Sequence, residues 1–539
     1  MARSRIFTAG YGQVTTYLVG VTMGTIALLV FLNASISFVI TDLIGQKINV
    51  GDATGTLGLA DELVIIFFSP IWGSISDHIG VQIVSAVGFA LMALSFLVIT
   101  QVRAVYPDLL LARLLFSLGA AASSCMITAI LPAVCSELPK AKDSASREDY
   151  TNSCQQATRE TRDDCSSTSE SRSTLEPSGG STSRAGGMVG FASGIGALFG
   201  FLGLRRIPAM FEKNGTSPAH ALKVSYGITA LVSLLIAIGC FFGLRGLSGR
   251  GNTGTRQRPS DSAPGQGGSP LGYSGLLKAA RLTVLRRDFG LAYLGGFVAR
   301  ASSVGVSLFV PLYVNTCFIS SGLCDLDPHR QHDVKSNCRS AFVVSSQMTG
   351  VSQAAGLIFA LVLGAFAGIK NAVYPLALSS ALGLVGFLLL ARSSCPSAES
   401  NAVDPGLLVI MAVVGISQIG AVVCSLGLLG KCVLSVATSE PSSGSGSPSA
   451  TGESTPLIEN IKNQDYSDIK GSIAGIYNLT GGLGILLLTK VGGLLFDKLS
   501  DSAPFIMLAT FNVILLSACL LYIVSSKGIL ANLRTKSKQ

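Results

Sequence analysis

Charged residues are scarce in this sequence. Asp, Glu, Lys and Arg together make up 13% of the 539 residues, whereas 49% are hydrophobic and the mean hydropathy is +0.55. Soluble globular domains carry about 25% charged residues. The shortage argues against a soluble enzyme and predicts a protein that crosses a membrane several times.

The signatures of an enzyme are also lacking. No nucleophile is accompanied by a base, and no nucleotide-binding loop is present. We therefore expect neither enzymatic activity nor a cofactor. The net charge of +9 needs no nucleic-acid partner, because retention of basic residues on the cytoplasmic side of a membrane explains it.

A cleavable signal peptide is not evident either. The short start at residues 1–16, with Arg3 and Arg5, leads into an apolar run that is too long for one. We expect residues 1–16 to form a cytoplasmic N-terminus and the first membrane helix to serve as an uncleaved anchor.

What the sequence does contain is a series of long apolar runs. A helix that crosses the hydrocarbon needs about 20 mostly apolar residues, because its backbone amides must bond within the helix. Twelve runs are of this kind, so the sequence predicts an all-α membrane protein with twelve transmembrane helices. The first six span residues 17–44, 57–75, 81–102, 109–135, 186–204 and 224–244. The second six span residues 291–314, 341–369, 372–391, 407–433, 473–495 and 505–524.

The twelve runs fall into two sets of six. Residues 17–244 hold the first set, residues 291–525 hold the second, and the polar linker 245–290 separates them. This arrangement predicts two pseudo-symmetric six-helix bundles. With both ends in the cytoplasm, including a C-terminus at 526–539, the cytoplasmic segments hold 25 of the 39 Lys and Arg when Lys431, at the cytoplasmic end of helix 407–433, is counted with them. That bias is the one expected from the positive-inside rule.

Two cytoplasmic loops, like the linker, have too few apolar residues to form a core. We expect loops 137–184 and 434–470 to be disordered. They are interpreted as flexible linkers, with phosphorylation-dependent regulation as the alternative. In the second loop, Glu453, Leu457 and Ile458 fit an acidic dileucine sorting signal, although a chance match would look the same. Such a signal would bind a sorting adaptor and route the protein to endosomes or a vacuole, rather than the plasma membrane.

Four cysteines lie in loops predicted to face the oxidising side, where we expect disulfides. They are Cys317, Cys324, Cys338 and Cys395. Four thiols allow three pairings, and all three stay open. A metal site made by Cys324, His329 and His332 matches no standard ligand spacing, so no metal is expected. On the same face, Asn214 begins a glycosylation sequon, which predicts a glycoprotein.

A short motif lies between the second and third apolar runs. Gly73, Asp77 and Gly80 form the pattern Gly-x-x-x-Asp-x-x-Gly, which resembles the signature of the major facilitator superfamily (MFS) between membrane helices 2 and 3. The resemblance implies the MFS fold, with Asp77 docked at the start of helix 11 around Gly471 as a latch that closes the cytoplasmic side. His78 replaces an expected basic residue, so the latch would be weaker or sensitive to pH. A simple tight turn is the alternative.

Charged residues inside predicted helices mark a functional pathway by default, because charge in the bilayer is costly. Arg113 lies in the segment 111–121, which partly resembles the Arg-bearing segment of helix 4 in the superfamily. Asp61 and Glu62 lie at comparable depth in helix 2, so a salt bridge between Arg113 and one of them is feasible. It would be purely structural, or the acid would accept a proton under the control of Arg113.

Helix 7 carries Arg300 near its midpoint. In the superfamily this helix faces the central cavity, so an unpaired guanidinium there would favour an anionic or carbonyl-bearing solute. A structural partner inside the protein is the alternative. Helices 8 and 10 add Gln347, Gln353 and Gln418, which would contact the solute or bond between helices.

Helix 5 is rich in glycine, a composition that lets helices pack closely. It lacks the Gly-Pro pair of proton-linked antiporters, so drug export is unsupported. Its glycines are Gly186, Gly187, Gly190, Gly194, Gly196, Gly200 and Gly203.

The resemblance covers about residues 17–525 and is strongest to the uncharacterised MFS general substrate transporters of fungi. It implies a monomeric secondary active transporter that moves a small organic solute through the lipid bilayer by alternating access, coupled to protons. The alternatives are a non-transporting membrane sensor or scaffold, and an organic-anion exchanger or uniporter without proton coupling.

Overall fold

The computed structural model describes most of the predicted membrane part of the chain. The described residues are 7, 9–45, 50–135, 179–204, 207, 210–211, 217–247, 280–281, 286–320, 339–369, 371–393, 404–437 and 470–536. Helices account for nearly all of them, and no strand occurs in these ranges.

The first half of the chain forms six rods. Helix 1 is assembled from α1 (Tyr11–Thr15), the π-helical turns of η1 (Thr16–Met23), α2 (Gly24–Phe38) and η2 (Val39–Leu43). Then follow α3 (Val50–Ile79), α4 (Val81–Ile99), η3 (Val105–Leu109) with α5 (Leu110–Cys135), α7 (Gly179–Leu198) with η4 (Phe199–Leu204), and α9 (Pro218–Gly243).

The second half repeats this plan. Its rods are α11 (Arg287–Ser320), α13 (Arg339–Ile369), α14 (Val373–Arg392), α15 (Pro405–Ala437), α17 (Lys470–Leu487) with η6 (Leu488–Gly492) and α18 (Gly493–Lys498), and α19 (Ala503–Lys536). Eleven helices of the described chain are long and apolar enough to cross a membrane. The rod made by α7 and η4 is the twelfth, and its many glycines lower its hydropathy.

Several rods extend beyond the predicted boundaries. The predicted end of the disordered loop 137–184 is wrong, because α7 already begins at Gly179. The predicted start of the loop 434–470 is too early, because α15 continues to Ala437. The predicted end of the linker 245–290 is too late, because α11 begins at Arg287. The segment expected as a C-terminal tail, 526–539, is helical as far as Lys536. Most of these stretches are polar and lack an apolar signal, yet they continue helices that are already nucleated.

Aromatic side chains bind the helices of each bundle together. In the first bundle, Phe31, Phe96, Phe116 and Tyr226 from four different helices form edge-on and tilted contacts at centroid separations of 5.3 to 6.0 Å. The second bundle has the pair Phe297 and Phe511, 5.2 Å apart. The sole Trp of the sequence, Trp72, also stays within its own bundle, because its indole Nε1 donates to the Leu118 carbonyl of α5 at 3.1 Å.

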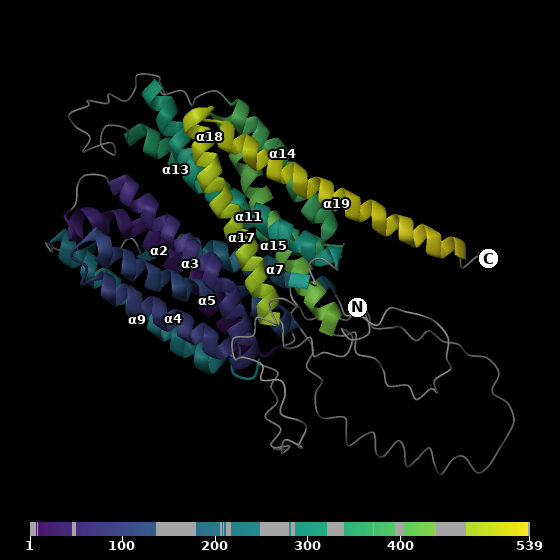
Figure 1. The fold of residues 1–539 in the computed structure, drawn as a ribbon, viewed down its shortest axis with the longest axis horizontal. Helices are drawn as coiled ribbons and strands as arrows, with labels where there is room; N and C mark the ends of the chain where they lie inside the picture. The colour runs from purple at the N-terminus through teal and green to yellow at the C-terminus, as the bar shows by residue number, and fades with distance from the viewer. Residues whose placement is uncertain are drawn as a thin grey trace, which may run out of the picture.

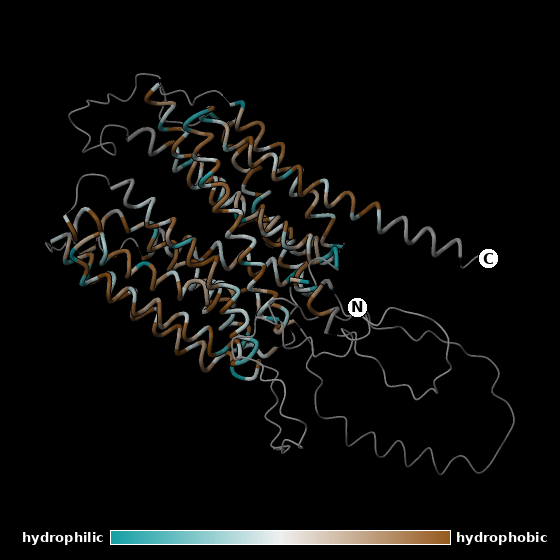
Figure 2. The backbone as a smooth tube through the Cα atoms, in the orientation of Figure 1, coloured by the Kyte–Doolittle hydropathy of each residue, from teal (hydrophilic) through white to brown (hydrophobic). Residues whose placement is uncertain are grey.

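The two bundles approach each other at one end and diverge towards the other (Figure 1). We call the end where α3 finishes the Asp77 end. Figure 2 shows apolar residues along most of each helix and hydrophilic residues gathered mainly near the helix ends. This distribution is the one required of helices that cross a hydrocarbon layer.

Two seams of close backbone contact join the bundles. In the first seam α3 packs on α17, and a Cβ atom added to Gly475 would lie 2.7 Å from Pro70 Cα. In the second seam α7 packs on α13, and a Cβ atom added to Gly187 would lie 2.8 Å from Gly364 Cα. The glycines of α7 therefore serve the close packing expected from the sequence.

Candidate functional site

Asp77 joins the two bundles at the end of α3. One of its carboxylate oxygens accepts the backbone N–H of Gly471 at 2.5 Å. The other accepts both the backbone N–H of Ser472, at 2.8 Å, and the Ser472 hydroxyl, at 2.7 Å. Because α17 begins at Lys470, these are unsatisfied first-turn amides at the positive end of a helix dipole, where a carboxylate is favoured.

Two glycines make this docking sterically possible. A Cβ atom on Gly73 would overlap the carbonyl oxygen of Gly471, so no other residue fits without parting the helices. Gly80 has a φ of 93°, a left-handed value that lets the chain turn from α3 into α4. His78 is exposed and makes no hydrogen bond to the described residues, so the Asp77 contact forms without it.

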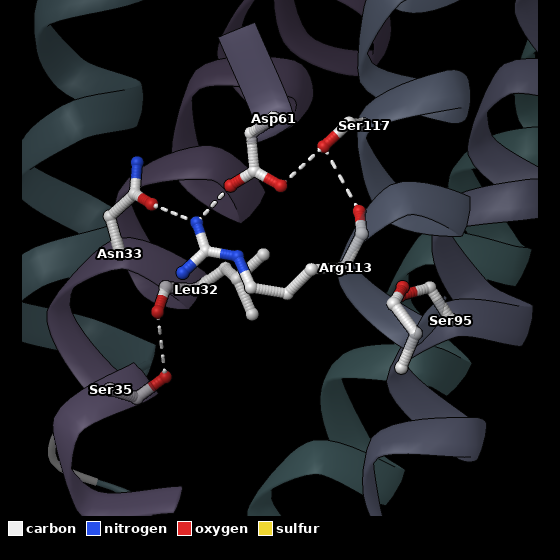
Figure 3. Close-up of polar contacts among 8 residues, drawn as sticks. Leu32, Asn33, Ser35, Asp61, Ser95, Arg113 and Ser117 are labelled. Carbon is white, nitrogen blue, oxygen red and sulfur yellow. Dashed lines mark hydrogen bonds and ion pairs between the residues drawn. The ribbon is translucent and has the colours of Figure 1, made fainter. Parts of the chain in front are cut away.

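A buried ion pair lies inside the first bundle (Figure 3). The Arg113 guanidinium of α5 pairs with Asp61 of α3 and donates a second hydrogen bond to Asn33 Oδ1 at 3.0 Å. The Ser117 hydroxyl donates to the other Asp61 oxygen at 2.7 Å. The side chains of Arg113 and Asp61 are 2% and 13% exposed, so neither charge faces lipid. Of the two acids that the sequence offered, Asp61 is therefore the one that pairs with Arg113.

Glu62 belongs to a different face of α3. It lies one turn from Ile66, on the same face of the helix, and Ile66 packs against α17, where a Cβ atom on Gly482 would lie 2.5 Å from Ile66 Cγ1. Glu62 is therefore directed across the first seam towards the second bundle. There it interacts electrostatically with Arg300.

Arg300 of α11 lies against the same part of α17. Its Cδ would be 2.8 Å from a Cβ atom on Gly481, and its Nη2 donates to Asn478 Oδ1 at 2.6 Å. Asn478 is fully buried. Arg300 thus has a partner inside the protein, which was one of the two alternatives stated from the sequence. That partner, Asn478, is neutral. Arg113 with Asp61 is the one salt bridge found among the described side chains.

The three predicted glutamines have different environments. Gln418 is buried and its amide donates to the Ser302 carbonyl at 3.1 Å, which ties α15 to α11. Gln347 and Gln353 are exposed on α13. Gln418 therefore bonds between helices, while Gln347 and Gln353 remain candidates for solute contact.

Asn33 and Asn478 were missed as site residues by the sequence argument. A signal was present, because an amide inside an apolar helix must find a hydrogen-bond partner in the membrane. Each asparagine accepts a hydrogen bond from one of the two interior arginines.

Most of the other predicted site residues lie outside the described residues. Cys317 is disulfide-bonded, whereas the other described cysteines are buried and form no disulfide. Cys324, Cys338, Cys395, Asn214, Glu453, Leu457 and Ile458 lie outside the described residues. Within the described ranges, no group of three His, Cys, Asp or Glu side chains could hold a metal ion.

Solved structures share this architecture. FucP in its outward conformation, described as an MFS transporter, has a TM-score of 0.55 and 12% identity, over 94% of this chain and 99% of its own. A variant of the Escherichia coli fucose:proton symporter FucP gives a TM-score of 0.54 at 12% identity, over 94% and 98%. The fold is that of the major facilitator superfamily. At this identity the likeness to MFS transporters concerns the fold and not the solute.

Other comparisons are weaker. The nucleoside transporter NupG aligns with a TM-score of 0.48 at 12% identity, over 94% of this chain and 99% of its own. A segment of 53 residues is 40% identical to the magnetosome protein MamH of Paramagnetospirillum magneticum, and the match covers 10% of this chain and 12% of that protein. No protein-family model matches the chain. The predicted likeness to fungal general substrate transporters therefore stays a prediction.

Proposed function

We propose that this protein is a secondary active transporter that moves a small organic solute across a membrane by alternating access. The supporting observation is the placement of four interior charges beside the junction of two bundles with the MFS fold. Asp61 and Arg113 pair within one bundle, while Glu62 and Arg300 interact across the junction. Charges inside membrane helices are costly and mark a functional pathway by default.

The contact at the Asp77 end acts as a gate in this proposal. Three hydrogen bonds from Gly471 and Ser472 to the Asp77 carboxylate hold the bundles together there. A hydrogen bond to a charged group contributes about 1.5 to 3 kcal/mol. The gate is therefore strong enough to favour closure at this end and weak enough to be reversed when a solute favours the other state.

The Asp61 and Arg113 pair provides proton coupling. Protonation of Asp61 would remove the charge that holds Arg113 and leave the guanidinium with the neutral Asn33 oxygen. Because an unpaired buried charge is strongly unfavourable, the helices would rearrange when the proton arrives. In this way the binding of a proton drives the bundles from one state to the other.

The location of the transporter is proposed from sequence patterns in segments outside the described residues. We propose a monomer in a vacuolar, endosomal or plasma membrane, with both ends of the chain in the cytoplasm. The acidic dileucine pattern at Glu453 would recruit a sorting adaptor, and the sequon at Asn214 would be glycosylated on the opposite face.

Reconstituted vesicles test the proposal. Purified protein is placed in liposomes, and the uptake of a broad panel of labelled solutes is measured with and without an imposed pH gradient. We expect concentrative uptake of some solute with the gradient, and uptake without accumulation for Asp61→Asn. Accumulation that persists in Asp61→Asn would refute this proton site, and a sensor or scaffold would move no solute. Lys498→Gln, which removes an exposed charge at the end of α18, is the control.

A further inference from the structure

Glu62 and Arg300 are the interior charges that lack a salt-bridge partner among the described residues. The charge of Asp61 is balanced by Arg113 inside one bundle. Glu62 and Arg300 come from different bundles, on α3 and α11, and interact electrostatically without a salt bridge. Because they do not pair directly with each other, each can accept a small-molecule group of the opposite charge.

The Arg300 side of this junction is suited to a carboxylate. A guanidinium binds a carboxylate through two parallel N–H donors, and Arg300 uses Nη2 in its described hydrogen bond, to Asn478. Asn478 is fully buried, and its Nδ2 makes no hydrogen bond to a described residue. The Cys125 thiol interacts with the Asn478 side chain, but sulfur is only a weak acceptor. Arg300 and Asn478 together carry more donors than the described residues satisfy, which suits an acceptor-rich group.

The Glu62 side is suited to a cation. Its carboxylate lies one turn from Ile66, which packs on Gly482 beside the glycine that accommodates Arg300. Glu62 therefore faces α17 about one turn beyond Gly482, and it interacts electrostatically with Arg300 of the other bundle. A cationic group held by Glu62 and a carboxylate held by Arg300 would belong to one small molecule.

Charge balance favours a solute of this kind over a simple anion. Asp61, Glu62, Arg113 and Arg300 sum to zero. A small anion or cation would leave an uncompensated charge in a medium of low dielectric, which is costly. A zwitterion satisfies both free groups and preserves neutrality.

We propose that the solute is a small zwitterion, bound between the bundles with its carboxylate on Arg300 and Asn478 and its cationic group on Glu62. This inference rests on the proposed function and narrows its solute class. The solute would draw the two bundles together, because each bundle supplies one of the two charges. Binding would then itself contribute to the change of state.

Matched pairs of probes test the charge requirement. Proteoliposomes of the full chain are loaded for counterflow with a mixture of α-amino acids, or with glycine betaine. Lactate is compared with alanine, from which it differs mainly by the ammonium group, and choline is compared with betaine, from which it differs by the carboxylate. We expect the zwitterion of at least one pair to exchange at least tenfold faster than its singly charged counterpart.

Variants assign the two ends of the solute. Glu62→Gln should reduce zwitterion exchange at least tenfold and raise the ratio of lactate to alanine exchange. Arg300→Gln should also reduce zwitterion exchange but raise the ratio of choline to betaine exchange. Asp497→Asn and Lys498→Gln, which remove exposed charges in α18, should leave these ratios unchanged.

The outcomes separate this inference from the proposed function. Exchange of lactate or choline at the rate of the zwitterions, or selectivity unaffected by Glu62→Gln, would overturn the zwitterion site while leaving a transporter. If the broader panel shows proton-driven uptake but every zwitterion fails to exchange, the site is again wrong. Failure of every solute with or without a pH gradient would contradict transport itself.

Discussion

The two seams between the bundles use similar backbone packing and different chemistry. In the first seam Gly73 of α3 touches Gly471 of α17, and in the second Gly364 of α13 touches Gly187 of α7. Four residues beyond the contact glycine, the first seam has Asp77, whereas the second has Gly368. Only the first of these residues can form a polar latch.

The ends of the partner helices explain the difference. Gly471 lies in the first turn of α17, which begins at Lys470, so free amides are present at the point of contact. Gly187 lies about two turns inside α7, which begins at Gly179, so its amides are already used within the helix. A carboxylate therefore has free backbone amides to bind at the first seam, whereas the amides of Gly187 and its neighbours in α7 are bonded within their own helix. The first seam is therefore suited to opening and closing, and the second to serving as a pivot.

Adding a methyl group to either seam should produce the largest effect. Gly73→Ala would overlap the Gly471 carbonyl, and Gly187→Ala would place a carbon 2.8 Å from Gly364 Cα. Overpacking of this kind costs about 1 to 3 kcal/mol, so both variants should melt at a lower temperature. Gly58→Ala is the matched control, because nothing lies within 4 Å of its added Cβ atom. Equal melting of all three variants would contradict close packing at the seams.

Removing the charge of Asp77 should open the first seam alone. Cys125 is buried, and its Sγ lies 4.0 Å from the Gly471 carbonyl oxygen, so its reaction with a maleimide reports opening there. Asp77→Asn weakens hydrogen bonds that contribute about 1.5 kcal/mol or more, which should raise the rate of Cys125 labelling about tenfold. Peptide mass spectrometry distinguishes Cys125 from the other thiols. Unchanged labelling would show that the carboxylate does not hold the seam.

Removing one hydroxyl from the latch should have a smaller effect. Ser472→Ala deletes the hydroxyl donor at 2.7 Å from Asp77 and keeps both backbone donors. The loss of about 1 kcal/mol should raise Cys125 labelling by about threefold to fivefold. Ser500→Ala, at the far end of η6 and α18, provides the control. An effect as large as that of Asp77→Asn would mean that the hydroxyl, rather than the helix terminus, dominates the latch.

His78 should contribute least. It is exposed beside the latch and makes no hydrogen bond to a described residue. His78→Gln should change Cys125 labelling by less than about twofold, because an exposed charge is well screened by solvent. The measurement is repeated at several pH values. A ratio of native to His78→Gln labelling rates that changes with pH would establish a pH-sensitive latch instead, because the pH dependence of thiol reactivity itself is common to both proteins.

The parts of this structure that follow from sequence are those with a local signal. Apolar runs predict the helices, and the spacing of Gly73, Asp77 and Gly80 predicts the latch through its resemblance to a known signature. The choice between Asp61 and Glu62 has no such signal, because adjacent residues project about 100° apart around a helix and packing sets the rotation. The early start of α7 at Gly179 could not be predicted from an apolar run, because its first turns are polar and glycine-rich.

The location of Trp72 offers a natural means of following the motion. The indole is the only one in the protein, stays attached to α5 through Leu118, and neighbours Gly73, where the bundles touch. Water that enters when the halves part would reach this fluorophore and shift its emission to longer wavelengths. The unmodified polypeptide, in native lipid, therefore carries an optical indicator of its own state.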